Sequence, residues 1–234
     1  MYNTNNLTKK LLAWYSIYQR DLPWRKTQDP YKIWLSEIML QQTQVDTVMP
    51  YYTKWINKYP RLKDVAEAEE GELLKIWEGL GYYNRCRNFK NAVDIIMKVY
   101  SGKIPSDYDA FIQMPGVGAY IASAVLSIAH DKPHPALDGN VIRVMARFLK
   151  RKRLSPFNKK VIHNHIRKWM KYGFPGDINQ ALMDIGSQIC KPNQAHCYNC
   201  PLENSCFAAQ TCSPESYPTP QLHKSIPNYD VVTG

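Results

Sequence analysis

Four of the chain's six cysteines lie within seventeen residues, in the stretch CKPNQAHCYNCPLENSC from Cys190 to Cys206. Four thiolates on one short loop suit a structural zinc ion or an iron–sulfur cluster. Zinc sites more often pair two Cys-x-x-Cys segments, and this loop has one, at Cys197 and Cys200. Disulfides are rare in a reducing compartment. The spacing C-x6-C-x2-C-x5-C therefore predicts a metal-centred loop near the end of the fold, with Cys86 and Cys212 outside it.

The rest of the chain has the pattern of helices. Apolar residues recur at helical spacing in successive runs, and clear two-residue alternation is absent. One predicted helix begins at Asp29 and Pro30, continues through LSEIMLQQTQV, and is ended or kinked by Pro50. The 234 residues suffice for one large domain or two lobes. We therefore expect an all-α protein.

The formal net charge of +10 favours a polyanionic partner, and nucleic acid is the first candidate. The basic run KRKR, at residues 150–153, is equally well read as a solvated helix end and as a phosphate contact. No apolar run approaches the ~20 residues that a membrane span needs. The N-terminal residues also lack the pattern of a secretory signal. We expect a cytoplasmic protein, nucleoid-associated and without membrane contact.

The stretch MPGVGAYIASA, from Met114 to Ala124, lies between two helical runs. Gly116 and Gly118 allow left-handed backbone conformations and leave the backbone open to a partner. The amides at the start of the following helix would suit a phosphate. An ordinary turn between helices is the alternative. The form resembles a helix-hairpin-helix element, which binds the DNA backbone without reading sequence.

Two carboxylates are candidates for chemistry. Asp138, in LDGNVIRV, precedes a helical pattern, so on local grounds alone it is a helix cap in a turn. Glu37 lies in WLSEIMLQQTQV, and on a continuous helix it would share one face with Leu40, Gln41, Gln44 and Val45. That face suits a base-binding pocket. On helix pattern alone, a surface Glu with a local contact is the simpler interpretation.

Five segments together decide between these interpretations. LPWR…PYKIWLSEIMLQQTQV, GLGYYNRCRN, MPGVGAY, LDGNVIRV and NQALMDIGSQIC follow one another in the order of the MutY-type adenine DNA glycosylases, which the chain resembles from about Leu22 to Cys206. These enzymes belong to the helix-hairpin-helix superfamily of base-excision glycosylases. The resemblance implies a two-lobed all-α fold. It also implies excision of adenine mispaired with 8-oxoguanine or guanine in double-stranded DNA.

The resemblance assigns roles to the two carboxylates. Glu37 is the general acid that protonates the adenine ring, and Asp138 stabilises or captures the sugar cation. We expect Glu37 to hold a proton near neutral pH and Asp138, at a helix mouth, to stay ionised. Asn140 is similar to the family's supporting amide. Tyr120 stands where bifunctional relatives carry a Lys, which predicts a monofunctional enzyme.

Further residues match family positions that contact the base or the duplex. The base pocket is expected to include Arg20, Trp24, Arg25, Leu40, Val45 and Gln180. DNA contacts are expected from Gln42, Leu80, Tyr82, Gly116, Val117, Gly118, Lys191 and His196. Leu80 and Tyr82 are alternatively core residues beside a glycine turn. Since a wedge has to be exposed, a buried side chain would contradict that role.

The resemblance also implies a [4Fe–4S] cluster on Cys190, Cys197, Cys200 and Cys206, which would be structural because no ligand position stays open. One lobe is expected at residues 23–133, and the second at 1–22 plus 134–212. Residues 213–234 are expected to be a linker and the start of a C-terminal Nudix-like domain that is otherwise missing. Without that domain, we expect adenine excision with a weaker preference for 8-oxoguanine over guanine. A monomer is the expected state.

Two other functions stay open at this point. A related branch removes thymine or uracil mispaired with guanine and also has Tyr after its hairpin, although QQTQV and GLGYY favour adenine. A non-catalytic DNA-binding protein with an iron–sulfur cluster is the third possibility. It has no need of both Glu37 and Asp138.

Overall fold

The computed structural model describes residues 2–211 and 213–219, and over these residues its regular elements are helices, which confirms the predicted all-α class. The α-helices are α1 (Thr4–Tyr18), α2 (Pro30–Met39), α3 (Val45–Lys58), α4 (Leu62–Glu67), α5 (Glu70–Trp77), α6 (Asn84–Val99), α7 (Tyr108–Phe111), α8 (Ala119–His130), α9 (Gly139–Phe148), α10 (Pro156–Trp169) and α11 (Pro175–Asp184). Short 3₁₀ turns lie at Pro23–Arg25, Met170–Tyr172, Cys197–Asn199, Glu203–Ser205, Ala208–Gln210 and Pro214–Ser216, and a π-turn lies at Ile185–Ile189. None of the helices in this part of the chain has the length and apolarity of a membrane span.

The chain between Asp29 and Pro50 forms two helices where the sequence predicted one. The Asp29 carboxylate accepts a hydrogen bond from the Tyr31 amide (2.9 Å) and, with Pro30, begins α2. Helix α2 ends at Met39, and α3 begins only at Val45. Pro50 lies inside α3 and does not end it. The prediction that Glu37 and Val45 share one face of a single helix is therefore wrong.

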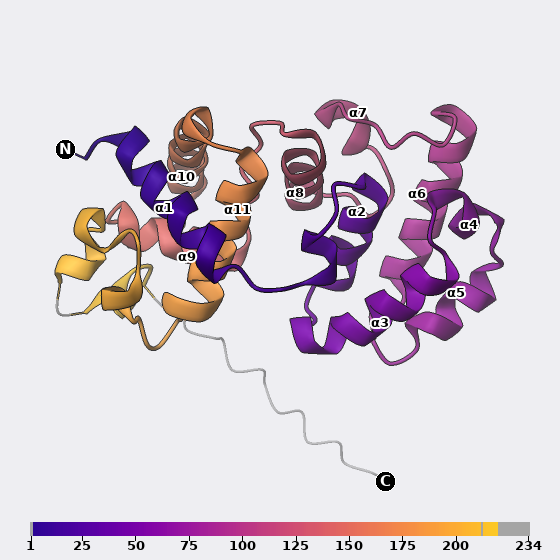
Figure 1. Ribbon diagram of the computed structural model, residues 1–234, viewed down its shortest axis with the longest axis horizontal. Coiled ribbons are helices and arrows are strands. Elements are labelled where there is room, and N and C mark those ends of the chain that lie inside the picture. Colours follow the sequence, from indigo (N-terminus) through magenta and orange to yellow (C-terminus); the bar gives the residue numbers. More distant parts are fainter. Residues whose placement is uncertain (1, 212, 220–234) are drawn as a thin grey trace, which may run out of the picture.

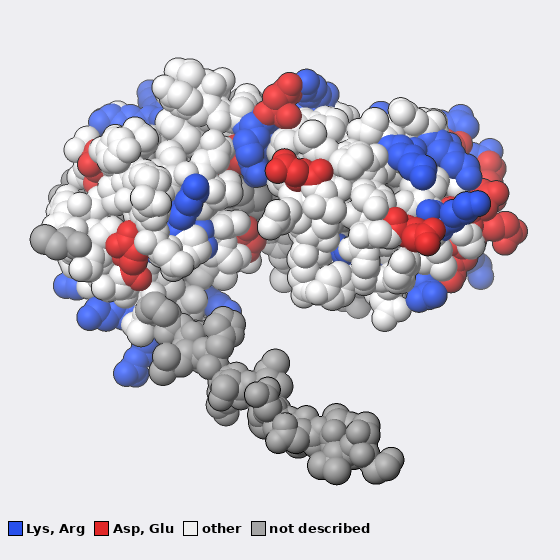
Figure 2. Space-filling model, turned by 90° about the horizontal axis from the view of Figure 1, so that it is seen from below, with Lys and Arg blue, Asp and Glu red and all other residues white. Residues whose placement is uncertain are grey.

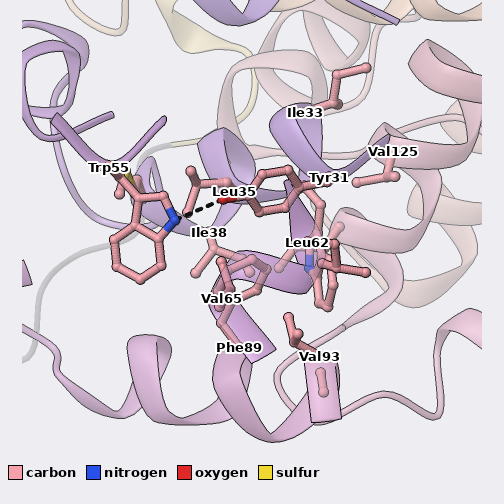
Figure 3. Close-up of a cluster of buried hydrophobic side chains, with 14 of the residues drawn as sticks. Tyr31, Ile33, Leu35, Ile38, Trp55, Leu62, Val65, Phe89, Val93 and Val125 are labelled. Carbon is pink, nitrogen blue, oxygen red and sulfur yellow. Dashed lines mark hydrogen bonds between the residues drawn. The ribbon is translucent and has the colours of Figure 1, made fainter. Parts of the chain in front are cut away.

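The first hydrophobic core lies among α2 to α8 and is rich in aromatic side chains. Trp34, Trp55, Trp77, Phe89 and Phe111 are all fully buried in it. Two of its polar groups are paired, as Figure 3 shows for the first: the Trp55 indole donates to the Tyr31 hydroxyl (3.0 Å), which donates to the Tyr59 carbonyl (2.6 Å). The buried Trp34 indole has no hydrogen-bond partner among the described residues. Satisfied polar groups avoid the cost of burial without a partner. This core fixes α2, which carries Glu37.

The second hydrophobic core joins α1 to the helices that follow α8. Leu7, Leu11 and Tyr15 of α1 pack with residues of α9, α10 and α11, among them Trp169 and Leu182. Figure 1 shows α1, α9, α10 and α11 together on one side and α2 to α6 on the other. The stretch after α1 then crosses from the second core to the first. Residues 20–25 are therefore placed between the two lobes.

Helices α8 and α11 join the two cores at close range. A Cβ at Gly176 would lie 2.7 Å from the Cα of Ile128 and 2.9 Å from the Ser127 carbonyl oxygen, so the first turn of α11 meets the end of α8 directly. The Asn179 side chain donates to the Ser127 hydroxyl (2.8 Å) and the His134 carbonyl (2.9 Å). Its oxygen accepts from the Ala136 amide (3.0 Å). The arrangement fixes one lobe against the other.

The basic run at residues 150–153 packs partly against the C-terminal segment. The Lys150 ammonium lies 4.6 Å from the centre of the Phe207 ring, and that of Lys152 lies 5.6 Å from the Tyr217 ring. These are cation–π contacts within the protein. Cys212 and the expected first strand of a further domain, IPNYDVVTG, lie outside the described residues.

Candidate active site

A cleft of about 760 Å³ opens where the two lobes meet. Ten of the predicted catalytic and pocket residues line it: Arg20, Trp24, Arg25, Glu37, Leu40, Val45, Tyr120, Asp138, Asn140 and Gln180. The cleft also includes Thr43, Met183, Ser187 and Gln188, which sequence reasoning missed. Residues far apart in sequence are thus brought to one cavity of the size and position typical of a ligand site.

Glu37 occupies the floor of the cleft, on the core-facing side of α2. Its side chain is buried, and burial raises the pKa of this carboxyl to about 7. The Tyr120 hydroxyl donates a hydrogen bond to Glu37 Oε2 (2.8 Å), which opposes the rise. The nearby Asp138 carboxyl acts in the same direction as burial, and Arg25 acts against it. Glu37 is therefore poised to hold a proton near neutral pH and release it, as the sequence predicted.

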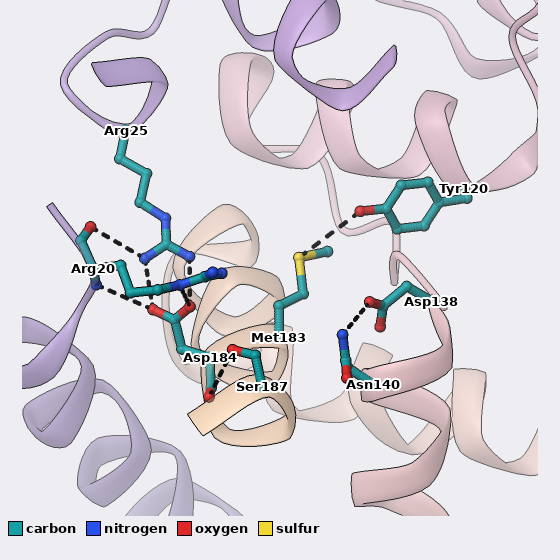
Figure 4. Close-up of polar contacts among 8 residues, drawn as sticks. All are labelled: Arg20, Arg25, Tyr120, Asp138, Asn140, Met183, Asp184 and Ser187. Carbon is teal, nitrogen blue, oxygen red and sulfur yellow. Dashed lines mark hydrogen bonds and ion pairs between the residues drawn. The ribbon is translucent and has the colours of Figure 1, made fainter. Parts of the chain in front are cut away.

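Tyr120 lies on the first turn of α8, directly after the glycine hairpin. Burial and the two neighbouring carboxyls, Glu37 and Asp138, raise the pKa of its phenol well above the ordinary value, so it remains a hydrogen-bond donor. Its hydroxyl also lies 3.9 Å from the Met183 sulfur, as Figure 4 shows. A phenol, unlike a lysine amine, cannot form a Schiff base with a carbonyl compound.

Asp138 caps the N-terminus of α9. Its Oδ1 accepts from the Val141 amide (2.6 Å), and its Oδ2 accepts from the Asn140 side chain (3.1 Å; Figure 4). Burial nevertheless raises the pKa of the Asp138 carboxyl above its ordinary value, while those two hydrogen bonds and Arg143 oppose the rise. Burial therefore outweighs the helix mouth in its effect on this pKa, and the ionised state of Asp138 stays a prediction. The same cap geometry holds the carboxylate in one orientation.

A chain of hydrogen bonds leads from Asp138 toward the cysteine loop. The Arg143 guanidinium donates to the Asn140 side-chain oxygen (2.8 Å), to the Gly186 carbonyl (2.7 Å) and to the Cys190 carbonyl (2.9 Å). Gly186 belongs to the π-turn, and a Cβ there would lie 2.6 Å from the Cβ of Asn140. The close approach of the π-turn to Asn140 thus requires glycine.

Asp184, at the end of α11, organises the arginines of the pocket and was not predicted. It is fully buried, and its two oxygens accept from Arg25 (2.5 and 2.9 Å) and from the Arg20 side chain (2.7 Å) and amide (3.3 Å; Figure 4). The Arg25 pair is bidentate, which fixes the guanidinium plane. A buried Asp in the apolar stretch ALMDIG was the available signal.

The candidate DNA-contacting residues differ in how far their side chains are exposed to solvent. Tyr82 is 61% exposed and Gln42 is exposed, as a wedge requires. Leu80 is only 5% exposed and packs in the first core, so its side chain does not suit that role. Gln42 and Tyr82 border a second cavity, which shares Glu37, Leu40, Tyr120 and Asp138 with the cleft. The cleft therefore opens toward the two exposed candidates.

The hairpin before α8 is tight. Gly116 has φ +76°, and a Cβ there would lie 2.9 Å from the Cβ of Asn88. Val117 is buried, whereas Gly118 caps α8 with free space around it. Contact with a phosphate would therefore use the backbone. On the face in Figure 2, Lys and Arg side chains are scattered among Asp and Glu rather than gathered in one band.

The four clustered cysteines line one small cavity of about 20 Å³, together with apolar side chains such as Leu202 and Ile189. Among the described residues, no three His, Cys, Asp or Glu side chains are arranged to hold a single metal ion. Lys191 is exposed and His196 is half-buried on the same loop.

The Arg147 guanidinium is buried beside this cavity. It donates to the Cys190 sulfur (3.2 Å) and to the carbonyls of Lys191, Pro192 and Tyr217 (2.8 Å each), and it has no carboxylate partner among the described residues. A buried cation calls for nearby negative charge. Four thiolates holding a cluster would supply that charge, so the donor set fits such a group.

Comparison with known proteins places these features in a family. Residues 35–171 match the HhH-GPD superfamily, base excision DNA repair proteins. The adenine DNA glycosylase of Rattus norvegicus is 40% identical over 215 residues, which cover 86% of this chain and 41% of the rat protein. The adenine DNA glycosylase of Buchnera aphidicola subsp. Acyrthosiphon pisum is 38% identical over 224 residues, 93% of this chain and 63% of that protein. The chain thus spans about half the length of these curated relatives.

Solved structures show the same architecture. A thermostable thymine-DNA glycosylase superimposes with a TM-score of 0.81 at 29% identity, covering 89% of this chain and 97% of that one. Endonuclease III, in a trapped covalent intermediate with DNA, superimposes with a TM-score of 0.70 at 22% identity, covering 88% and 96%. The second likeness concerns the fold alone.

Proposed function

Because the chain belongs to the HhH-GPD superfamily of base excision DNA repair proteins, we propose that it hydrolyses the N-glycosidic bond of adenine mispaired with 8-oxoguanine or guanine in duplex DNA. One observation carries the proposal: the carboxyl groups of Glu37 and Asp138 line the same cleft, and the pKa of Glu37 is raised to about 7. The adenine DNA glycosylases among the relatives support the choice of base.

The geometry suits a dissociative hydrolysis. Glu37, protonated, donates its proton to a ring nitrogen of the extruded adenine, and the electron pair of the glycosidic bond leaves with the base. Positive charge then develops on the deoxyribose, where the oriented Asp138 carboxylate stabilises or captures it. Water supplies the hydroxyl group to the sugar, and its proton returns to a carboxylate of the site. The products are free adenine and an abasic site.

Several side chains of the cleft suit the base itself. Trp24 and Leu40 offer apolar surface to its faces, and Gln180 and the arginines offer donors and acceptors to its edges. We propose that Asp184 acts as a positioning residue, because it fixes the direction of the Arg25 guanidinium. The exposed Gln42 and Tyr82 would fill the space that the base leaves in the duplex.

A substrate panel tests the proposal. The protein is incubated with duplexes that carry A, T or U opposite G or 8-oxoguanine, and abasic sites are revealed with alkali. We expect cleavage of the adenine duplexes, loss of it in Glu37→Gln and Asp138→Asn, and retention in Glu69→Gln, which changes an exposed side chain away from the cleft. Borohydride should trap no abundant covalent adduct. Cleavage confined to the T or U duplexes, or absent from every duplex, would refute the adenine assignment.

The same panel addresses a second candidate. The structural similarity to a thymine-DNA glycosylase, which superimposes over 97% of its length, supports removal of thymine as the second candidate function. Thymine lacks the ring nitrogens of a purine imidazole, so protonation by Glu37 would aid its departure less. Product from T opposite G that exceeds product from A opposite G would favour this second function.

We also propose that Cys190, Cys197, Cys200 and Cys206 hold a [4Fe–4S] cluster. When bound, such a cluster ties the loop through four thiolates and leaves no ligand position open. The shared cavity and the buried Arg147 support this assignment. Protein purified without oxygen should contain about four iron and four sulfide per chain, and Cys200→Ala should lose them. Stoichiometric zinc without sulfide would contradict the proposal.

A further inference from the structure

One arginine contacts both loops that border the outer cavity. Arg85 lies on the first turn of α6, facing the 40–44 loop on one side and the 78–83 loop on the other. Its Nη1 donates to the carbonyls of Ile38 (3.0 Å), Met39 (3.0 Å) and Gln41 (2.5 Å). Its Nη2 donates to the Thr43 hydroxyl (3.2 Å) and to the carbonyls of Leu80 and Gly81 (3.2 Å each).

Only a guanidinium can donate hydrogen bonds to acceptors on two loops from one planar group. Carbonyls at the end of a helix lack the amides of a following turn and favour a cation. Here the Ile38 carbonyl also accepts from the Gln41 amide (3.3 Å). No carboxylate pairs with Arg85 in the described part of the chain, so carbonyl dipoles balance its charge. A planar guanidinium can serve acceptors on two sides at once, whereas an ammonium is a single point.

Both loops contain a strained residue beside these acceptors. Gln42 has φ +58° and Tyr82 has φ +49°, a region that costs a non-glycine residue about 1–3 kcal/mol. Gln42 lies between two of the groups that accept from Arg85, Gln41 and Thr43, and Tyr82 follows a third, Gly81. The Arg85 guanidinium also lies 5.2 Å from the centre of the exposed Tyr82 ring. The arginine thus stabilises the two strained positions that project from this surface.

We propose that Arg85 is a positioning residue that fixes the loops of Gln42 and Tyr82 as one rigid unit, so that both side chains enter a paired duplex together when the target base is extruded. The inference rests on the proposed function. Unstacking a base costs a few kcal/mol. Loops that are already ordered add no further entropy cost to that step. The requirement for Arg85 should therefore disappear when the target adenine is already unpaired.

Two duplexes separate this role from general folding. One carries adenine opposite 8-oxoguanine, and the other carries the same adenine in a bulge without a partner. With enzyme in saturating excess, Arg85→Ala should slow excision from the paired duplex at least about tenfold, since several hydrogen bonds to a charged group are lost. Excision from the bulge should change by less than about threefold, because extrusion there costs little. The matched control is Arg87→Ala. Arg87 lies on α6, as Arg85 does, but its side chain is exposed and pairs with Glu70 of α5, so this variant should leave both rates unchanged.

The melting temperature of each variant is measured alongside. If Arg85→Ala does not fold, Arg85→Lys takes its place. The lysine ammonium keeps the charge but can donate hydrogen bonds to only one of the two loops. Excision from the paired duplex should again slow more than excision from the bulge. Equal slowing on both duplexes would show that Arg85 acts through the fold as a whole and would overturn the inference, as would an unchanged rate on the paired duplex. If the unaltered protein releases adenine from neither duplex, the proposed function itself fails.

Discussion

The Tyr120 hydroxyl donates a hydrogen bond of 2.8 Å to the Glu37 carboxyl, across a sequence separation of 83 residues. The bond stabilises the ionised form of Glu37 and opposes the effect of burial on its pKa. This one contact therefore lowers the pH at which Glu37 loses its proton.

Tyr120→Phe removes that contact and should raise the pKa of Glu37 further. Because the general acid must be protonated, excision falls as pH rises through the Glu37 pKa of about 7. In the variant, this alkaline limb should move to higher pH by about one unit, the worth of a charge-assisted hydrogen bond. Single-turnover rates between pH 5 and pH 9 measure it, and a shift toward lower pH would contradict the assignment.

Glu37→Gln should abolish excision and stabilise the protein above neutral pH. The folded-state pKa of about 7 exceeds the ordinary value of 4.5, so between these values the folded protein binds a proton that the unfolded chain has released. Stability contributed by Glu37 therefore falls as pH rises. The variant should gain nothing at pH 4 and up to about 3 kcal/mol at pH 8. Urea unfolding at the two pH values measures the gain, and a gain that is larger at pH 4 would reverse the sign of the argument.

Asp184→Ala should destabilise the fold, because it leaves Arg25 buried without its carboxylate. Breaking a buried ion pair from one side costs about 3–5 kcal/mol. The control, Asp94→Ala, removes an exposed partner of Lys90 and should cost less than about 1 kcal/mol. Urea unfolding at pH 7 compares them, and equal effects would show that the Arg20 and Arg25 contacts contribute little.

Gly186→Ala should disturb Asn140 and, through it, Asp138. The added Cβ meets the backbone and Cβ of Asn140 at 2.6–3.2 Å, too close without displacement. Overpacking of this kind costs about 1–3 kcal/mol, and the single-turnover rate should fall with it. Gly71→Ala, in open space on α5, should leave the rate unchanged. A Gly186 variant with an unchanged rate would mean that Asn140 does not hold Asp138 in its active orientation.

The sequence predicted well those features whose signal is local or carried by a motif. The helix cap at Asp138, the hairpin and the grouping of Glu37 with Tyr120 in one cleft needed only short segments and their order. Asp184 and Arg85 were missed because most of the hydrogen-bond partners of their side chains lie 42 to 164 residues away; of all these partners, only Leu80 and Gly81 are near Arg85 in sequence. The break after Met39 escaped for the same reason. The apolar pattern there continues, but Arg85 takes the carbonyls of Ile38, Met39 and Gln41 in place of further helix.

The sequence pattern also did not predict which side chains beside the glycine turn are exposed to solvent. Leu80 and Tyr82 are two residues apart beside the same glycine turn, yet one is buried and the other is 61% exposed. The left-handed conformations of Gly79, Gly81 and Tyr82 reverse the chain within those few residues. A turn of that kind decides which side chain faces outward, and it depends on contacts made elsewhere.

The packing of α1 has a consequence for the order in which the protein forms during synthesis. Leu7, Leu11 and Tyr15 leave the ribosome before the helices they pack against, which end with α11, near residue 184. At roughly 5–20 residues per second, α1 waits on the order of ten seconds or more for its partners. The lobe built from α2 to α8 can close in that interval, while α1 remains an unpaired amphipathic segment. Cellular factors that bind exposed apolar helices thus have longer access to α1 than to the later helices of its core.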